Sequence, residues 1–197
     1  MAKIAIFASG NGSNFEALAN FFLNDRENKI TLLIYDRKEA YVVKRAEKYN
    51  IKSYYINYFK LGKELAEKEI IKIIKDNEID LILLAGFMRI LSPEFIKEIK
   101  IPIVNIHPSL LPKYKGTHAI ERAYNSGDTE SGITIHYVNE ELDSGEIILQ
   151  KAIPIEKDKG LSYFENEIHK LEHFWYPIVA KNICDKININ NESKRTI

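Results

Sequence analysis

The chain of 197 residues contains a single cysteine, Cys184, and this scarcity excludes two kinds of architecture. An internal disulfide cannot form, and one sulfur cannot build a thiolate metal cluster. An excess of charge of one sign is missing as well, since 28 Lys and Arg balance 28 Asp and Glu. Proteins that bind nucleic acid or anionic membranes usually show a basic excess, so we expect neither partner. A lone cysteine suits a reducing compartment, and we expect the protein in the cytoplasm.

Long hydrophobic runs, internal repeats and low-complexity linkers are also missing. The N-terminal stretch MAKIAIFASGNGSN has an apolar run too short for a signal h-region or a membrane span. With 45% hydrophobic residues, the chain can nevertheless bury a core. The length predicts one domain over residues 1–197, with a frayed polar tail at 185–197.

Short apolar runs alternate with amphipathic stretches through the first half of the chain. Strands are predicted at 3–8, 29–35, 52–57, 79–86 and 101–107. Helices are predicted at 15–23, 39–50, 63–78 and 93–99. This alternation predicts an α/β fold, a doubly wound and mostly parallel sheet with helices on both faces and right-handed connections. Farther on we expect a helix at 117–127, an antiparallel strand pair at 132–138 and 146–155, and a long helix at 160–183 that Pro177 kinks or divides.

Two polar side chains interrupt the predicted strand at 101–107 near its carboxyl end. Asn105 and His107 alternate with aliphatic residues, so both point to one face of the strand. Pro108 biases His107 towards an extended conformation. An amide and an imidazole presented together can stabilise a carbonyl oxygen that gains negative charge. The alternative is a buried histidine that satisfies backbone groups, but paired polar residues at a strand end favour a site.

A glycine-rich turn, SGNGSN at 9–14, joins the first predicted strand to the first helix. Free backbone N–H groups beside a helix N-terminus can bind an anion. The spacing matches neither G-x-G-x-x-G nor a P-loop. A tight turn that needs glycine for positive φ explains the same residues, so both interpretations stay open at this point.

Two further stretches carry candidate residues. AGFMRIL at 85–91 follows the fourth strand, where open parallel sheets bind ligands, although core packing explains its apolar side chains equally well. Asp143 lies in a turn between two strands, and its carboxylate could pair with protonated His107. His136 is predicted to be structural. His169 and His173 lack a glutamate directly after the first histidine, as the H-E-x-x-H zinc motif requires, and Glu172 does not fit that pattern, so no metal site is expected.

Five segments, in their order and spacing, resemble the phosphoribosylglycinamide formyltransferases, folate-dependent enzymes of purine synthesis. These segments are SGNGSN, LAGFMRIL, NIHPSLLPKYKG, GITIHYV and ELDSGEIILQ, within residues 3 to about 183. NIHPSLLP with a later LDSG marks the wider formyltransferase family, and GNGSN points to this branch. The resemblance implies direct formyl transfer from 10-formyltetrahydrofolate to the amine of glycinamide ribonucleotide. It implies a tetrahedral intermediate, small-molecule substrates, no metal, and a monomer or weak homodimer.

The resemblance also assigns roles to residues. The catalytic trio would be Asn105, His107 and Asp143, in which the amide and the protonated imidazole stabilise the oxyanion. Asp143 would support the charge on His107 and help a proton move through water. The ribonucleotide would be bound by Gly12, Ser13, Asn14, Lys170 and Glu172. The folate would be bound by Lys63, Met88, Arg89, Ile90, Leu91, Asn105, Asn139, Glu140, Glu141, Leu142 and Asp143. Lys63 stands where the family often has arginine and loses the bidentate geometry of that residue.

Three alternatives explain part of the pattern. A formyltetrahydrofolate hydrolase or another formyltransferase would share the trio, but we expect neither the regulatory domain of the first nor the basic tRNA-binding surface of a methionyl-tRNA formyltransferase. A nucleotide-binding module without catalysis would leave Asn105, His107 and Asp143 unexplained. A dehydrogenase would place an acid where Asp36 lies, but the glycine spacing is wrong for a dinucleotide, so Asp36 is predicted to be a loop residue.

Overall fold

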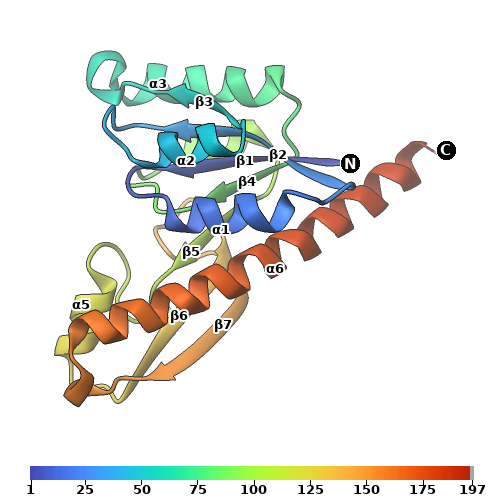
Figure 1. Cartoon of the computed structure of the whole chain (residues 1–197). Coiled ribbons are helices and arrows are strands. Elements are labelled where there is room, and N and C mark those ends of the chain that lie inside the picture. The colour runs from blue at the N-terminus through green and yellow to red at the C-terminus, as the bar shows by residue number, and fades with distance from the viewer. Residues whose placement is uncertain (196–197) are drawn as a thin grey trace.

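A seven-stranded sheet in the order β3-β2-β1-β4-β5-β6-β7 forms the centre of the structure, a computed structural model that describes residues 1–195 (Figure 1). Its strands are β1 (Ala2–Ala8), β2 (Asn28–Tyr35), β3 (Lys52–Tyr55), β4 (Leu81–Leu84), β5 (Ile103–His107), β6 (Glu130–Tyr137) and β7 (Ile147–Pro154). The first five strands pair in parallel, whereas β6 pairs antiparallel with both β5 and β7. The predicted fold class is therefore confirmed.

Helices cover both faces of this sheet. They are α1 (Ser13–Phe22), α2 (Val42–Lys48), α3 (Tyr58–Asp76), α4 (Pro93–Ile99), α5 (Ala119–Asn125) and α6 (Leu161–Arg195), with a 3₁₀ turn η1 (Lys157–Lys159). Residues of α1, α2, α5 and α6 share one apolar core, and residues of α3 and α4 share the other. Figure 1 shows α3 across the sheet from α1 and α6. Among the helices of residues 1–195, none has the length and apolar character that a membrane span requires.

The period of two along β1 explains how one strand serves both cores. Ile4 and Ile6 pack into the core beneath α1 and α6, whereas Ala5 and Phe7 pack into the core beneath α3. A strand that is buried on both faces must be apolar, as β4 is throughout and β1 is after Lys3. The apolar composition of these two strands thus accounts for their place in the interior of the sheet.

The last helix differs from its prediction. It continues to Arg195 rather than ending near 183, so residues 185–195 are helical, while 196 and 197 lie outside the described residues. Pro177 lies within α6 and does not end it. The extension has partners on the sheet, because the Asn188 amide donates to the Asn28 side chain at 3.0 Å. These contacts join residues far apart in sequence, which local patterns do not reveal.

Candidate active site

The carboxyl ends of β1, β4 and β5 meet at one edge of the sheet. From β1 the chain proceeds to β2 and β3 on one side, then crosses to β4 on the other. Ligands of open α/β sheets bind at such a switch point. The two loops there are tied together, because Ser9 N–H donates to the Gly86 carbonyl at 3.1 Å and Met88 N–H donates to Ser9 Oγ at 2.8 Å.

A polar cluster lies beside this switch point, where β5 meets β6. Nδ2 of Asn105 lies 3.3 Å from Nε2 of His136, its partner across the antiparallel pair. Nδ1 of His107 lies 3.5 Å from Oδ2 of Asp143, whose Oδ1 lies 3.7 Å from Nε2 of His136. His107, His136 and Asp143 are buried. The structure therefore brings together the predicted residues Asn105, His107 and Asp143, and it adds His136.

The loop between β6 and β7 holds Asp143 firmly. Asp143 adopts a left-handed conformation, with φ of 48°, and the Gly116 N–H donates to its Oδ2 at 2.8 Å. Gly145 follows at a position where a Cβ would lie 1.7 Å from the Tyr137 carbonyl oxygen. Only glycine fits so close an approach of two backbones, so this turn fixes where the carboxylate points.

His136 is a neutral hydrogen-bond acceptor in this cluster. Burial lowers its pKa, and the Tyr137 carbonyl and Asp143 oppose that effect only in part. Its Nδ1 lies 2.9 Å from the Tyr137 carbonyl oxygen, which can only accept, so Nδ1 carries the proton. Nε2 therefore accepts from the Asn105 amide and orients it. From the sequence alone His136 is predicted to be structural, because only the pairing register shows that it lies opposite Asn105.

His107 is held by the segment that follows it. Its Nε2 lies 2.9 Å from the Tyr114 carbonyl oxygen, so Nε2 carries a proton that it donates there. The segment itself is bound to β6, because Leu111 N–H donates to Thr134 Oγ1 at 3.0 Å and Thr134 Oγ1 donates to the Ser109 carbonyl at 2.6 Å. The chain after His107 thus forms one wall of the site and fixes a ring proton.

The glycine-rich turn leads directly into α1. Gly12 caps the helix with φ of 77°, and it has no side chain to accept a bond from the first turn. The N–H groups of Ser13 and Asn14 therefore stay available at the positive end of the helix. Asn14 Nδ2 donates to Glu172 Oε2 at 3.1 Å, and Glu172 is buried. The predicted residues of the turn and the carboxylate of α6 thus lie together.

On α6 the structure separates two predicted neighbours. Lys170 is exposed and pairs with Glu167 at 2.6 Å, on a different side of the helix from Glu172. His169 approaches Glu172 instead, with its Nδ1 2.9 Å from Oε2, and that hydrogen bond raises the pKa of His169. The place of His169 beside the turn is not among the predictions from sequence, although its i,i+3 spacing from Glu172 indicates that the two side chains can meet.

The loop after β4 divides into exposed and buried side chains. Met88 and Ile90 are 56% and 61% exposed and could face a ligand. Leu91 is 5% exposed and belongs to the core beneath α3, so a folate contact of its side chain stays a prediction. Arg89 Nε lies 2.6 Å from Oδ2 of Asp36, a buried side chain that follows β2. Asp36 is thus an internal partner of the loop.

Lys63 and residues 139–142, which are also predicted to contact the folate, are exposed. Residues 139–142 form the turn before Asp143, in which Asn139 Oδ1 accepts from Glu141 N–H at 3.1 Å. Glu140 pairs with Lys97 at 3.2 Å. Lys63 is exposed on α3, directly after the non-helical Gly62. Residues 139–142 directly precede Asp143 in the sequence and so lie near the site. A place for Lys63 at the site stays a prediction.

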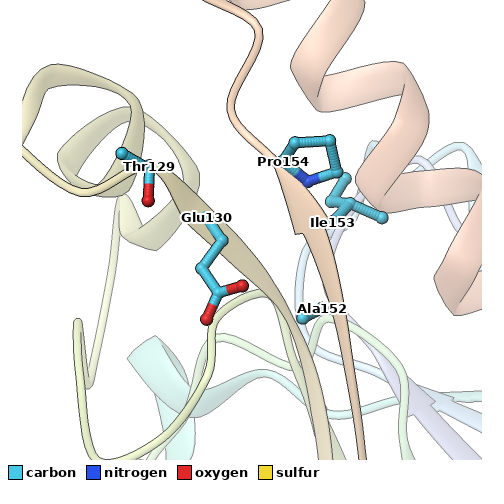
Figure 2. Close-up of a pocket in the computed structure, with 5 residues that line it drawn as sticks. All are labelled: Thr129, Glu130, Ala152, Ile153 and Pro154. Carbon is cyan, nitrogen blue, oxygen red and sulfur yellow. The ribbon is translucent and has the colours of Figure 1, made fainter.

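A cavity of about 370 Å³ lies away from this cluster, where β6 begins and β7 ends. Figure 2 shows its lining on the two neighbouring strands and at the residue before β6: Thr129, Glu130, Ala152, Ile153 and Pro154. Glu130 is the one ionisable side chain in that set. His136 lies at the other end of β6, so the cavity and the polar cluster are separate features. Chemistry favours the cluster over the cavity as the active site, because the cluster joins an amide, imidazoles and a carboxylate, whereas the cavity lining offers one carboxylate.

An open α/β sheet that presents an amide, an imidazole and a carboxylate at its carboxyl edge is typical of an enzyme acting on a carbonyl group. The Formyl transferase family matches residues 2–180, and the chain belongs to that family.

Named relatives agree with this assignment. The phosphoribosylglycinamide formyltransferase of Bacillus subtilis (strain 168) is 41% identical over 197 residues, covering 99% of this chain and 100% of that protein. The trifunctional purine biosynthetic protein adenosine-3 of Drosophila melanogaster is 38% identical over 179 residues, covering 89% of this chain and 13% of that protein. The crystal structure of glycinamide ribonucleotide transformylase 1 from Geobacillus kaustophilus has a TM-score of 0.89 at 38% identity, covering 93% of this chain and 99% of that one.

Proposed function

We propose that this protein transfers the formyl group of 10-formyltetrahydrofolate to the amine of glycinamide ribonucleotide, a step of purine synthesis. The observation that carries the proposal is the convergence of Asn105, His107 and Asp143 at the carboxyl edge of β5, beside a free helix N-terminus. The name of the full-length Bacillus relative supports the reaction. The name of the Drosophila relative supports the place in purine synthesis.

The Asn105 amide would act on the formyl oxygen. The substrate amine attacks the formyl carbon, a C–N bond forms, and the carbonyl oxygen becomes an oxyanion. One amide hydrogen of Asn105 is directed to His136, so the other is free to donate to that oxygen. A preorganised donor of this kind contributes roughly 10²–10³ in kcat.

His107 and Asp143 would stabilise the charge of the intermediate and assist the transfer of the amine proton. The Nε2–H of His107 now meets the Tyr114 carbonyl, and the formyl oxygen would replace that carbonyl as acceptor. A proton on Nδ1 would lie between the ring and the Asp143 carboxylate, so the positive imidazolium would sit beside a negative partner. As the intermediate collapses, the bond to the folate nitrogen breaks, and a proton from the attacking amine reaches that nitrogen through water near Asp143. The residues of this chain need no metal for these steps.

The substrates would occupy opposite sides of the trio. The phosphate would accept N–H bonds from Gly12, Ser13 and Asn14, and Glu172 would bind the ribose hydroxyls or the amine. The folate ring would lie against Met88, Arg89 and Ile90, the backbone of Leu91 and the turn Asn139, Glu140, Glu141, Leu142 and Asp143. Lys63 would stand on the folate side. A role for Lys170 would require its amine to leave Glu167.

We extend the proposal to the whole chain. It would work as a single domain, as a monomer or weak homodimer, on small molecules rather than nucleic acid or membranes. A cytoplasmic setting would keep its buried Cys184 reduced.

A comparison of formyl acceptors tests this function. Purified protein is given 10-formyltetrahydrofolate with glycinamide ribonucleotide, with water alone, or with charged initiator tRNA, and loss of the formyl group is followed. We expect turnover with the ribonucleotide only, and a fall in kcat by a factor of about 10² or more in His107→Ala and Asn105→Ala. Absence of turnover with the ribonucleotide would refute the function, and turnover with water alone would identify a hydrolase.

A further inference from the structure

One side chain of α2 holds the glycine-rich turn from outside. Arg45 Nε donates to the Asn11 carbonyl at 2.8 Å, and its Nη2 donates to Asn11 Oδ1 at 3.0 Å. Its Nη1 pairs with Glu16 in the first turn of α1. A single guanidinium therefore joins three elements, and its planar fork matches acceptors that lie in fixed positions.

The turn depends on α2 for its shape. Gly10 offers its carbonyl to the Val42 N–H at 3.1 Å, at the start of α2. Gly12 approaches the same residue so closely that a Cβ would lie 2.4 Å from Val42 Cγ2. Backbone contact with Val42 on one side and the Arg45 fork on the other thus leave the turn little freedom. N–H groups that bind an anion must be held in this way before the ligand arrives.

Arg45 also acts on a charge at the anion site. Glu16 lies in the first turn of α1, beside the N–H groups of Ser13 and Asn14. An unpaired carboxylate there would repel a phosphate. Arg45 and Lys48 engage its two oxygens, and Arg45 is the more shielded partner, with 19% of its side chain exposed against 65% for Lys48.

We propose that Arg45 is a positioning residue for the phosphate-binding turn, which it fastens through Asn11 while it neutralises Glu16. The inference rests on the proposed function, because it takes the turn to bind the phosphate of the substrate. Lys48 provides the matched comparison, since it also pairs with Glu16, at 3.1 Å, but its other contact is with the Tyr49 ring rather than with Asn11. A purely structural ion pair would make the two residues equivalent.

The test measures ribose 5-phosphate binding by calorimetry in the wild type, Arg45→Lys and Lys48→Ala. Arg45→Lys keeps the charge but loses the fork, so we expect affinity to fall about tenfold, while Lys48→Ala stays within about twofold. In steady-state assays Arg45→Lys should raise KM for the ribonucleotide, with KM for the formyl donor unchanged and kcat little affected. Asn11→Ala, at an exposed position, should shift ribose 5-phosphate affinity in the same direction even if the arginine variant melts early.

Several outcomes would overturn the inference. One is unchanged ribose 5-phosphate affinity in both Arg45→Lys and Asn11→Ala, and another is an equal loss for both substrates. A wild type that transfers formyl but does not bind ribose 5-phosphate would also overturn it and leave the function intact. Conversely, phosphate binding that depends on Arg45 without any formyl transfer would uphold the inference while the proposed function fails.

Discussion

Asn105 has two amide hydrogens, and the structure engages one of them with His136. The neutral imidazole is fixed by the Tyr137 carbonyl on its other side. The hydrogen bonds from backbone to ring and from ring to amide therefore each have one defined direction. A carboxamide can rotate by half a turn and exchange its donor and acceptor ends. His136 prevents that exchange, because an unprotonated nitrogen accepts only from the N–H end. At the scale of residues, the direction of the amide therefore depends on the buried His136.

Replacement of His136 should therefore reduce kcat more than it changes the binding of the substrates. We expect His136→Leu, which lacks an acceptor, to lower kcat about tenfold, because the amide loses its orientation. His136→Gln, whose side-chain oxygen can accept near the position of Nε2, should recover much of that loss. Steady-state kinetics with both substrates measures the effect, and the difference between the two variants separates orientation from packing. Equal kcat in the two variants would contradict the role.

The sequence predicts the direction of some side chains at the site better than that of others. Alternation along one strand placed Asn105 and His107 on one face without any tertiary information, since side chains in a strand have a period of two. Leu91 and Lys170 lie in a loop and on a helix, where direction depends on which neighbours pack nearby. Sequence neighbours on a helix point about 100° apart, so Lys170 turns to Glu167 while Glu172 turns to Asn14.

At the scale of elements, α6 braces the edge of the sheet that carries the site. Tyr176 lies wholly buried on this helix, and its hydroxyl is 2.9 Å from the Leu84 carbonyl and 3.0 Å from the Val104 carbonyl. These carbonyls belong to β4 and β5, immediately before the loop at Ala85 and before Asn105. The apolar pattern of α6 predicted the helix, but its extent and this brace depend on contacts with strands far away in sequence.

Loss of that hydroxyl should destabilise the protein. We expect Tyr176→Phe to lower the free energy of unfolding by about 1–2 kcal/mol, because buried carbonyls lose their partner. Tyr163→Phe is the matched control on the same helix, since that hydroxyl contacts Lys159 Nζ at 3.4 Å near the surface. Urea titration of both variants provides the measurement. A Tyr176→Phe midpoint equal to that of the control would show that the hydroxyl contributes nothing.

At the scale of the whole molecule, the sheet joins a parallel half and an antiparallel half. The parallel half supplies the turn at Gly12 and the loop at Met88, and the antiparallel pair supplies His136 and Asp143. The alternation of strands and helices predicts the parallel half well, because each strand–helix–strand unit is formed by residues that are close in sequence. The meeting of Asp143 with His107 was open from sequence, since it depends on the register of β6 against β5.

One substitution in the antiparallel half should therefore impair the chemical step without impairing phosphate binding. In Gly145→Ala the new Cβ would meet the Tyr137 carbonyl oxygen at 1.7 Å, so the turn that aims Asp143 must shift. We expect kcat to fall about tenfold or more, because His107 loses its carboxylate partner. Ribose 5-phosphate affinity should stay within about twofold, since the anion-binding turn belongs to the parallel half. Gly127→Ala is the control, because a Cβ there meets nothing within 4 Å. Unchanged kcat in Gly145→Ala, or a parallel loss of ribose 5-phosphate binding, would show that the halves do not divide chemistry from phosphate binding.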